Sequence, residues 1–231
     1  MRRNNKDKIL SAARRLFLKH GYSGVSLRSI AKEAKLTTGA VYFHFKNKME
    51  IYRTICFEAI DILINSVRDA IGKRKTINQK LISTFDSYIQ FYYNHSDYYN
   101  ILMEYKADYS ADGMEGVKPI SSRMDVMIGI MRDVIGQGIR EGEFVEIDPK
   151  MLSLFLAAVA EGMLQFKKLG MFEYLNIGDR DFRDFMADVI GRGILPQLKR
   201  GDVGEVPAVR INPRIAERHA VQRTTTKEEP Q

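Results

Sequence analysis

Apolar residues recur every three or four positions along most of the chain, and this spacing restricts the fold more than any other feature. The first such stripe consists of Ile9, Ala12, Ala13, Leu16 and Phe17. This is the period of an amphipathic α-helix, and Gly21 is expected to end that helix. Similar stripes predict further helices, which lie at about residues 27–34, 38–45, 48–72, 78–94, 97–109, 120–140, 149–169 and 181–198. Since no strand pattern or internal repeat is found, the sequence predicts an all-α fold.

The composition excludes several classes of protein. No run approaches the ~20 consecutive apolar residues of a membrane-spanning helix, and the first residues lack the apolar core of a signal peptide, so we expect a cytoplasmic protein. Cys56 is the only cysteine, which rules out an intrachain disulfide. On its apolar helix we interpret it as a buried core thiol. The four histidines are far apart, and there is no Gly-rich phosphate loop. We therefore expect no enzyme activity, no metal and no cofactor.

Positive charge is concentrated near the N-terminus. Residues 1–53 contain 13 Lys and Arg against 3 Asp and Glu, a net charge of +10, whereas residues 54–198 have a net charge of −5 and residues 199–231 one of +2. This distribution is expected when only the first part of the chain meets a polyanion such as DNA. A basic stretch can also be a plain solvated surface, so the charge alone does not decide between the two.

The segment between Ser26 and Phe45 has the pattern of a helix-turn-helix, in which two short helices are joined by a turn of about four residues. Ser26 and Thr37 are placed to cap the two helices. The inner faces are expected to consist of Leu27, Ile30, Ala31, Leu36, Val41 and Phe45. The second helix then faces outward with Thr38, Gly39, Tyr42, Phe43 and His44, residue types that can approach base edges and phosphates. Lys46 and Lys48 extend this surface, and Lys48 lies near a helix start that favours phosphate.

The stretch from Asp7 to about Tyr52 resembles the N-terminal domain of the tetracycline-repressor (TetR/AcrR) family of transcriptional regulators. The resemblance rests on the AA-x-x-LF helix, the Gly-Tyr stop, IAKEA, the small residue before Gly39, Tyr42-x-x-Phe45 and Lys48. It implies phosphate contacts for Ser26, Thr37, Tyr42, His44 and Lys48, and base contacts for Arg28, Thr38, Gly39 and Phe43. Ser26 and Thr37 can also act as caps alone, Arg28 can be merely solvated, and His44 can be a packed aromatic.

One residue departs from the family pattern. The family usually has glycine in the turn where this chain has Lys35. If Lys35 adopts a left-handed conformation, it costs roughly 1 kcal/mol relative to glycine.

The resemblance also implies a homodimer whose larger helical domain binds a small molecule. For dimerisation the expected residues are Phe155, Val159, Met163, Phe185 and Val189, on two apolar helices that could instead pack only within one subunit. For the ligand, an apolar pocket is expected to involve Tyr92, Met103, Tyr105, Met127, Met131 and Phe166. At helical spacing such residues can also be ordinary core.

The sequence therefore predicts an N-terminal three-helix DNA-binding domain at residues 1–50, a larger helical effector-binding and dimerisation domain at 51–198, and a largely disordered tail at 199–231. The expected function is that of a sequence-specific regulator, in particular a repressor released from a palindromic operator by a small hydrophobic or aromatic effector. The alternatives are an activator, a low-specificity DNA binder without a ligand, and a helical enzyme or interaction adaptor whose basic domain is vestigial.

Overall fold

The computed structural model describes the backbone of residues 2–112 and 114–194, and the side chains of residues 5–104 and 122–194. The tail predicted at 199–231 lies outside these residues. The described chain contains helices α1 (Arg2–His20), α2 (Leu27–Glu33), α3 (Thr38–His44), α4 (Lys48–Gly72), α5 (Ile77–Asn94), α6 (Ser96–Asp112), α7 (Met114–Arg140), α8 (Pro149–Lys168), α9 (Met171–Tyr174) and α10 (Asp179–Ile194). No strand occurs in this part of the chain, and the predicted all-α fold is confirmed.

Most helix boundaries lie close to the sequence prediction, but α1 begins at Arg2 rather than near Lys8, and α6 ends at Asp112 rather than near residue 109. Helix α7 begins at Met114 rather than near residue 120. The four-residue helix α9 was not predicted, because a single turn is too short to show a period. It follows Gly170, whose φ of +74° lets the chain reverse after α8.

Side-chain caps begin the short helices as the sequence predicts. The Ser26 hydroxyl accepts from the Ser29 amide at 3.0 Å, and the Ser29 hydroxyl accepts from the Ser26 amide at 3.0 Å, which forms a reciprocal capping box. The Thr37 hydroxyl accepts from the Ala40 amide at 3.1 Å. Such caps satisfy amides that have no partner inside the helix, so each helix start is fixed by its own sequence.

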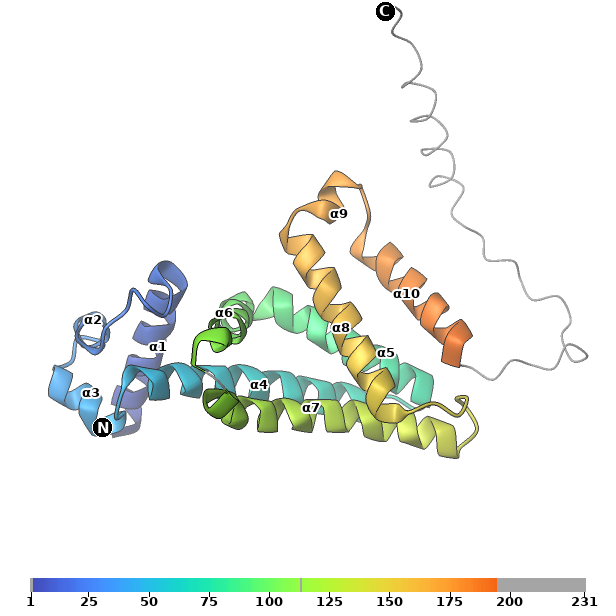
Figure 1. Cartoon of the computed structure of the whole chain (residues 1–231), viewed down its shortest axis with the longest axis horizontal. Coiled ribbons are helices and arrows are strands. Elements are labelled where there is room, and N and C mark those ends of the chain that lie inside the picture. The colour runs from blue at the N-terminus through green and yellow to red at the C-terminus, as the bar shows by residue number, and fades with distance from the viewer. Residues whose placement is uncertain (1, 113, 195–231) are drawn as a thin grey trace, which may run out of the picture. The chain divides into compact units, whose positions relative to one another are not determined.

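Helices α1 to α3 form a head at one end of the described chain, and α4 runs from this head along the helices of the body (Figure 1). One hydrophobic core continues from the head into the body. It includes Phe17 and Val41 of the head and Ile55, Ile60 and Leu63 of α4, all at most 1% exposed. The predicted domain boundary after residue 50 lies in the first turn of α4, so this helix belongs to both packing regions. No helix within the described residues is long and apolar enough to cross a membrane.

Lys35 adopts a left-handed conformation, with a φ of +57°. Its amide donates to the carbonyl of Lys32 at 3.1 Å, and the amide of Leu36 donates to the carbonyl of Ala31 at 2.9 Å. These two bonds form a Schellman motif, which normally favours glycine at the left-handed position. The lysine therefore strains the turn between α2 and α3.

Replacing Lys35 with glycine is expected to raise the free energy of unfolding by about 1 kcal/mol, because glycine adopts positive φ without steric cost. Urea denaturation followed by circular dichroism measures this change. Lys32→Gly is the matched control, since it removes the same charge from a right-handed helical position and should lower the stability by a similar amount. Equal destabilisation by both substitutions would contradict the strain at Lys35.

Candidate nucleic-acid interface and ligand cavity

Helix α3 buries one side and exposes the other. Val41 and Phe45 are at most 2% exposed, whereas Tyr42 and Phe43 on the opposite side are 57% and 66% exposed. Position 39 is also exposed, and a Cβ atom built there would meet only the Thr37 hydroxyl, at 3.9 Å. A large exposed aromatic pair beside an open glycine leaves a surface that another molecule can approach closely.

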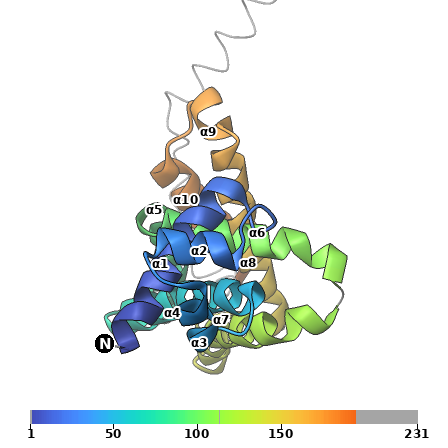
Figure 2. The same cartoon turned by 90° about the vertical axis from the view of Figure 1, so that its left-hand side faces the viewer.

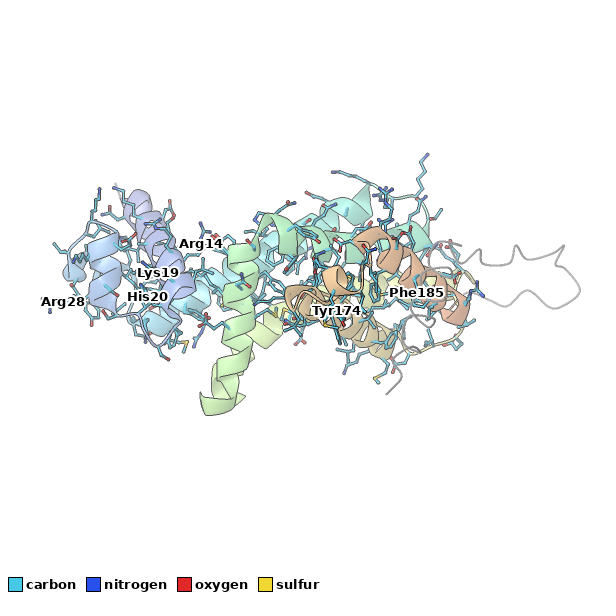
Figure 3. The ribbon with its side chains drawn as sticks, turned by 90° about the horizontal axis from the view of Figure 1, so that it is seen from above. Arg14, Lys19, His20, Arg28, Tyr174 and Phe185 are labelled. Carbon is cyan, nitrogen blue, oxygen red and sulfur yellow. The ribbon has the colours of Figure 1, made fainter. Side chains whose placement is uncertain are left out.

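A shallow groove runs along the surface between α2 and α3. It is lined by Ser26, Arg28, Ser29, Ala31, Lys32, Leu36, Thr37 and Thr38. Four of the predicted DNA-contacting residues are therefore brought to one groove, namely Ser26, Arg28, Thr37 and Thr38. Figure 2 views the molecule from the head end, with α2 and α3 towards the viewer, and Figure 3 shows Arg28 at the far tip of the head.

The side chain of Lys48 already has a contact within the protein. Its Nζ atom donates to the carbonyl oxygen of Tyr22 at 2.6 Å and lies 4.1 Å from the centre of the Tyr22 ring. Desolvation by burial lowers the pKa of Lys48. An ammonium has three donors, so two remain for a phosphate. Lys48 is also the first residue of α4, so its positive charge lies at the start of that helix.

The start of α4 offers fewer free amides than its position in the sequence suggested. The Asn47 side chain accepts from the Glu50 amide at 2.8 Å, and the Glu50 carboxylate accepts from the Lys46 amide at 2.6 Å. Glu50 also places a negative charge in this first turn. Any attraction of phosphate to the start of α4 therefore depends mainly on the ammonium of Lys48.

Helix α6 holds the head against the body through contacts that the sequence did not reveal. The Tyr52 hydroxyl on α4 donates to the carbonyl of Ile101 on α6 at 2.9 Å, and the bond is buried. The Glu104 carboxylate accepts from the Tyr22 amide at 3.3 Å, just after α1. The Tyr52 ring also packs edge-on against Phe17, with centroids 4.8 Å apart. A displacement of α6 would therefore act directly on the segment that leads into α2.

A cavity of about 160 Å³ lies in the body between α4, α5, α7, α8 and α10. Its walls are mainly apolar, and they include Met127 and Met131, two residues predicted for a ligand pocket. Three other predicted ligand residues do not line it. Tyr92 instead packs on Tyr99, with ring centroids 4.9 Å apart. Met103 lines a neighbouring surface depression, which shares Glu161 with the cavity, and Phe166 is exposed on α8. The side chain of Tyr105 is outside the described residues.

The polar part of the cavity wall was also missed by sequence reasoning. Glu161 on α8 accepts from the hydroxyl of Tyr88, from the hydroxyl of Tyr99 at 3.2 Å and from Nε2 of Gln165 at 2.8 Å. Burial, followed by the charge of Glu161, raises the pKa values of Tyr88 and Tyr99. Both hydroxyls therefore remain protonated donors. No local motif could have revealed this cluster, because its members come from three helices.

Arg183 on α10 also lines the cavity. Its guanidinium lies 2.8 Å from the carboxylate of Asp184 and 3.5 Å from that of Asp86. These contacts, led by the hydrogen bond to Asp184, raise the pKa of Arg183. The charge of this arginine is therefore balanced within the protein.

Helices α8 and α10 expose apolar side chains beyond those that fill the core. Phe155, Phe185 and Val189 are each more than half exposed, and all three were predicted for dimerisation. Figure 3 shows Phe185 in the body, at the opposite end from Arg28. Val159 is only partly buried against the core. Met163 corrects the prediction, because at 5% exposure it belongs to the core of this subunit and is not available to a partner.

The thiol of Cys56 is buried in α4, as expected from its apolar neighbours in the sequence. Desolvation raises its pKa to about 12. A thiol with so high a pKa carries almost no thiolate near neutral pH, so this residue is not suited to redox sensing.

Among known proteins, a family model matches the head and the first turns of α4 but not the rest of the chain. Residues 9–55 match the family described as bacterial regulatory proteins, tetR family. The HTH-type transcriptional activator FasR of Mycolicibacterium smegmatis is 26% identical over 103 residues, which are 45% of this chain and 47% of FasR. The HTH-type transcriptional regulator QacR of Staphylococcus aureus is 40% identical over 52 residues, 22% of this chain and 28% of QacR. The chain thus matches about half or less of the length of these two relatives.

The fold of most of the described chain is also found among solved structures. The TetR-family transcriptional regulator PfmR from Thermus thermophilus superposes with a TM-score of 0.62 at 19% identity, covering 80% of this chain and 97% of PfmR. At this identity the likeness establishes the fold and not the ligand. The proteins named in these comparisons are transcription regulators rather than enzymes.

Proposed function

We propose that this chain, which contains a tetR-family regulatory domain at residues 9–55, is a dimeric, sequence-specific DNA-binding transcription regulator that acts in the cytoplasm. The observation that carries the proposal is the exposed face of α3, flanked by the groove that holds Ser26, Arg28, Thr37 and Thr38. The net charge of +10 over residues 1–53 favours DNA as the partner of this face.

The geometry of α3 suits a DNA major groove. An α-helix with its side chains is about 10–12 Å across, close to the groove width of about 12 Å, and α3 is exposed on its outer side. We assign phosphate contacts to Ser26, Thr37, Tyr42, His44 and Lys48. Base contacts are assigned to Arg28 on α2 and to Thr38, Gly39 and Phe43 on α3. The hydroxyls of Ser26 and Thr37 act as acceptors in the helix caps, so each keeps a proton that can be donated to a phosphate oxygen. The Ser26 hydroxyl points to Ser29 Oγ at 3.2 Å and would turn from it to a phosphate.

Dimerisation supplies the second recognition helix that tight binding requires. A single head offers few base contacts, whereas two heads bind two half-sites whose centres are about 34–36 Å apart. The exposed side chains of Phe155, Phe185 and Val189 on α8 and α10 provide an apolar surface for the partner subunit. We therefore expect a palindromic operator.

A chain of contacts leads from the cavity to the head and supports control by a small, hydrophobic or aromatic effector. Glu161 at the cavity wall accepts a hydrogen bond from Tyr99 on α6. On the same helix, α6, the carbonyl of Ile101 accepts a hydrogen bond from the Tyr52 hydroxyl of α4. A ligand that displaces Tyr99 would shift α6, and with it the head, so that the two recognition helices lose their spacing. We favour a repressor released by its effector. An activator is the second candidate, because FasR is named as one.

Substitutions on α3 should separate phosphate contacts from base contacts. Tyr42→Phe is expected to weaken binding to every duplex by about 10- to 150-fold, because a hydrogen bond to a charged phosphate is worth about 1.5–3 kcal/mol. Thr38→Ala should instead reduce the preference for particular bases while leaving binding to random duplex unchanged. Fluorescence anisotropy with selected and random duplexes at fixed salt measures both effects.

Tyr174→Phe is the matched control for Tyr42→Phe, since it removes the hydroxyl of an exposed tyrosine on α9, in the body. It should leave DNA affinity unchanged. If Tyr42→Phe also left affinity unchanged for all duplexes, α3 would not be the DNA-contacting helix.

Val189→Asp is expected to convert the dimer to a monomer, because it places a charge in an apolar interface. Val126→Asp on α7 is the matched control, as valines 189 and 126 are similarly exposed, at 51% and 42%. Sedimentation velocity of the full chain gives the oligomeric state. A dimer that survives Val189→Asp but is lost with Val126→Asp would place the interface on α7.

A further inference from the structure

Glu161 is a carboxylate without a cationic partner at the wall of an apolar cavity. Its three donors, Tyr88, Tyr99 and Gln165, are all neutral. Among the described side chains, no Lys, Arg or His nitrogen lies within 4.0 Å of its carboxylate. Arg183, the one cation among the lining residues, is paired with Asp184 and Asp86. The wall of the cavity therefore has one negative charge that nothing in the described chain balances.

This charge determines which ligands the cavity favours. Glu161 is partly buried: one side of its carboxylate lines the apolar cavity, and Glu161 also lines the surface depression that includes Met103. On the cavity side, neutral hydrogen bonds offset only part of the cost of moving the carboxylate away from water. A carboxylate has about four acceptor sites, and three are used here. A ligand ammonium could take the fourth site or replace one of the tyrosine hydroxyls. It would be attracted more strongly than in bulk water, since the cavity side of the carboxylate is lined mainly by apolar residues. An anionic ligand would be repelled.

The size of the cavity limits the apolar part of the ligand. An engineered protein cavity of about 150 Å³ with apolar walls accommodates a molecule of benzene. The cavity here, at about 160 Å³, is of that size. Three methionines, Met124, Met127 and Met131, line one side and allow some adjustment because their side chains are flexible.

We propose that the cavity binds a small organic cation, a single ring or short alkyl group bearing one protonated amine, whose ammonium contacts the carboxylate of Glu161. This inference rests on the proposed function in one respect, namely that the cavity is the site where the effector binds. The ammonium competes with the hydroxyls of Tyr88 and Tyr99 for Glu161. Since Tyr99 belongs to α6, the charge of the ligand is sensed on the helix that holds the head.

Three probes with the same ring and different charges test the proposal. Benzylamine is cationic, benzyl alcohol is neutral and benzoate is anionic at pH 7. Isothermal titration calorimetry of each with the full chain, in the absence of DNA, should show benzylamine binding about tenfold more tightly than benzyl alcohol, and benzoate most weakly. Glu161→Gln should abolish the preference for the amine and leave the affinity for the alcohol unchanged.

Two further variants keep the test decisive. Glu146→Gln removes an exposed carboxylate that does not line the cavity, and it should retain the preference for benzylamine. Tyr88→Phe removes one hydroxyl from Glu161, so it should increase the affinity for benzylamine and not that for benzyl alcohol. This second variant leaves the carboxylate intact if Glu161→Gln does not fold.

The proposal is overturned if benzoate binds most tightly, if the three probes bind equally, if none binds, or if the amine preference survives Glu161→Gln. Duplex binding is measured separately on the same proteins. Normal DNA binding combined with any of these results refutes the ligand class alone. Loss of specific DNA binding with the expected order of probe affinities refutes the proposed function and leaves the ligand class standing.

Discussion

The buried hydrogen bond from Tyr52 on α4 to the carbonyl of Ile101 on α6 lies at the junction on which the rest of the structure depends. Helix α4 shares its core with the head, and α6 contacts both α1 and α4. The Tyr22 amide is held by Glu104 from the same helix. Because packed helices move as units, the head cannot change its orientation without disturbing α6. The position of the recognition helix is thus set in the body, where the cavity also lies.

Local features of this fold could be predicted from the sequence because they depend on neighbouring residues. The period of apolar residues predicted the helices, and Ser26 and Thr37 cap α2 and α3 as expected. The left-handed conformation of Lys35 was a possibility raised by the family resemblance, and the structure shows it. The outward residues of α3 followed from the same reasoning. A seven-residue helix with its inner side buried leaves little choice about which side chains face solvent.

Features that depend on the contact of distant helices could not be predicted in this way. Helix α8 is apolar on most sides, so periodicity alone did not separate Met163, which is buried, from Phe155, which is exposed. Tyr92 and Phe166 resemble pocket residues by type, yet the cavity forms elsewhere, where α4, α5, α7, α8 and α10 meet. The importance of Glu161 became visible only when α5 and α6 brought Tyr88 and Tyr99 to it, beside Gln165 on its own helix.

Two copies of the head are proposed to bind a defined DNA sequence through α3, and every functional role assigned above depends on this. Selection of bound duplexes from a random pool by the full chain tests it most directly. We expect enrichment of a palindrome or near-palindrome whose half-site centres are about 10 base pairs, or a multiple of that, apart. Recovery of duplexes with no common sequence would contradict sequence-specific binding and would leave a low-specificity DNA binder. Recovery of no duplex at all would show that the basic head does not bind DNA.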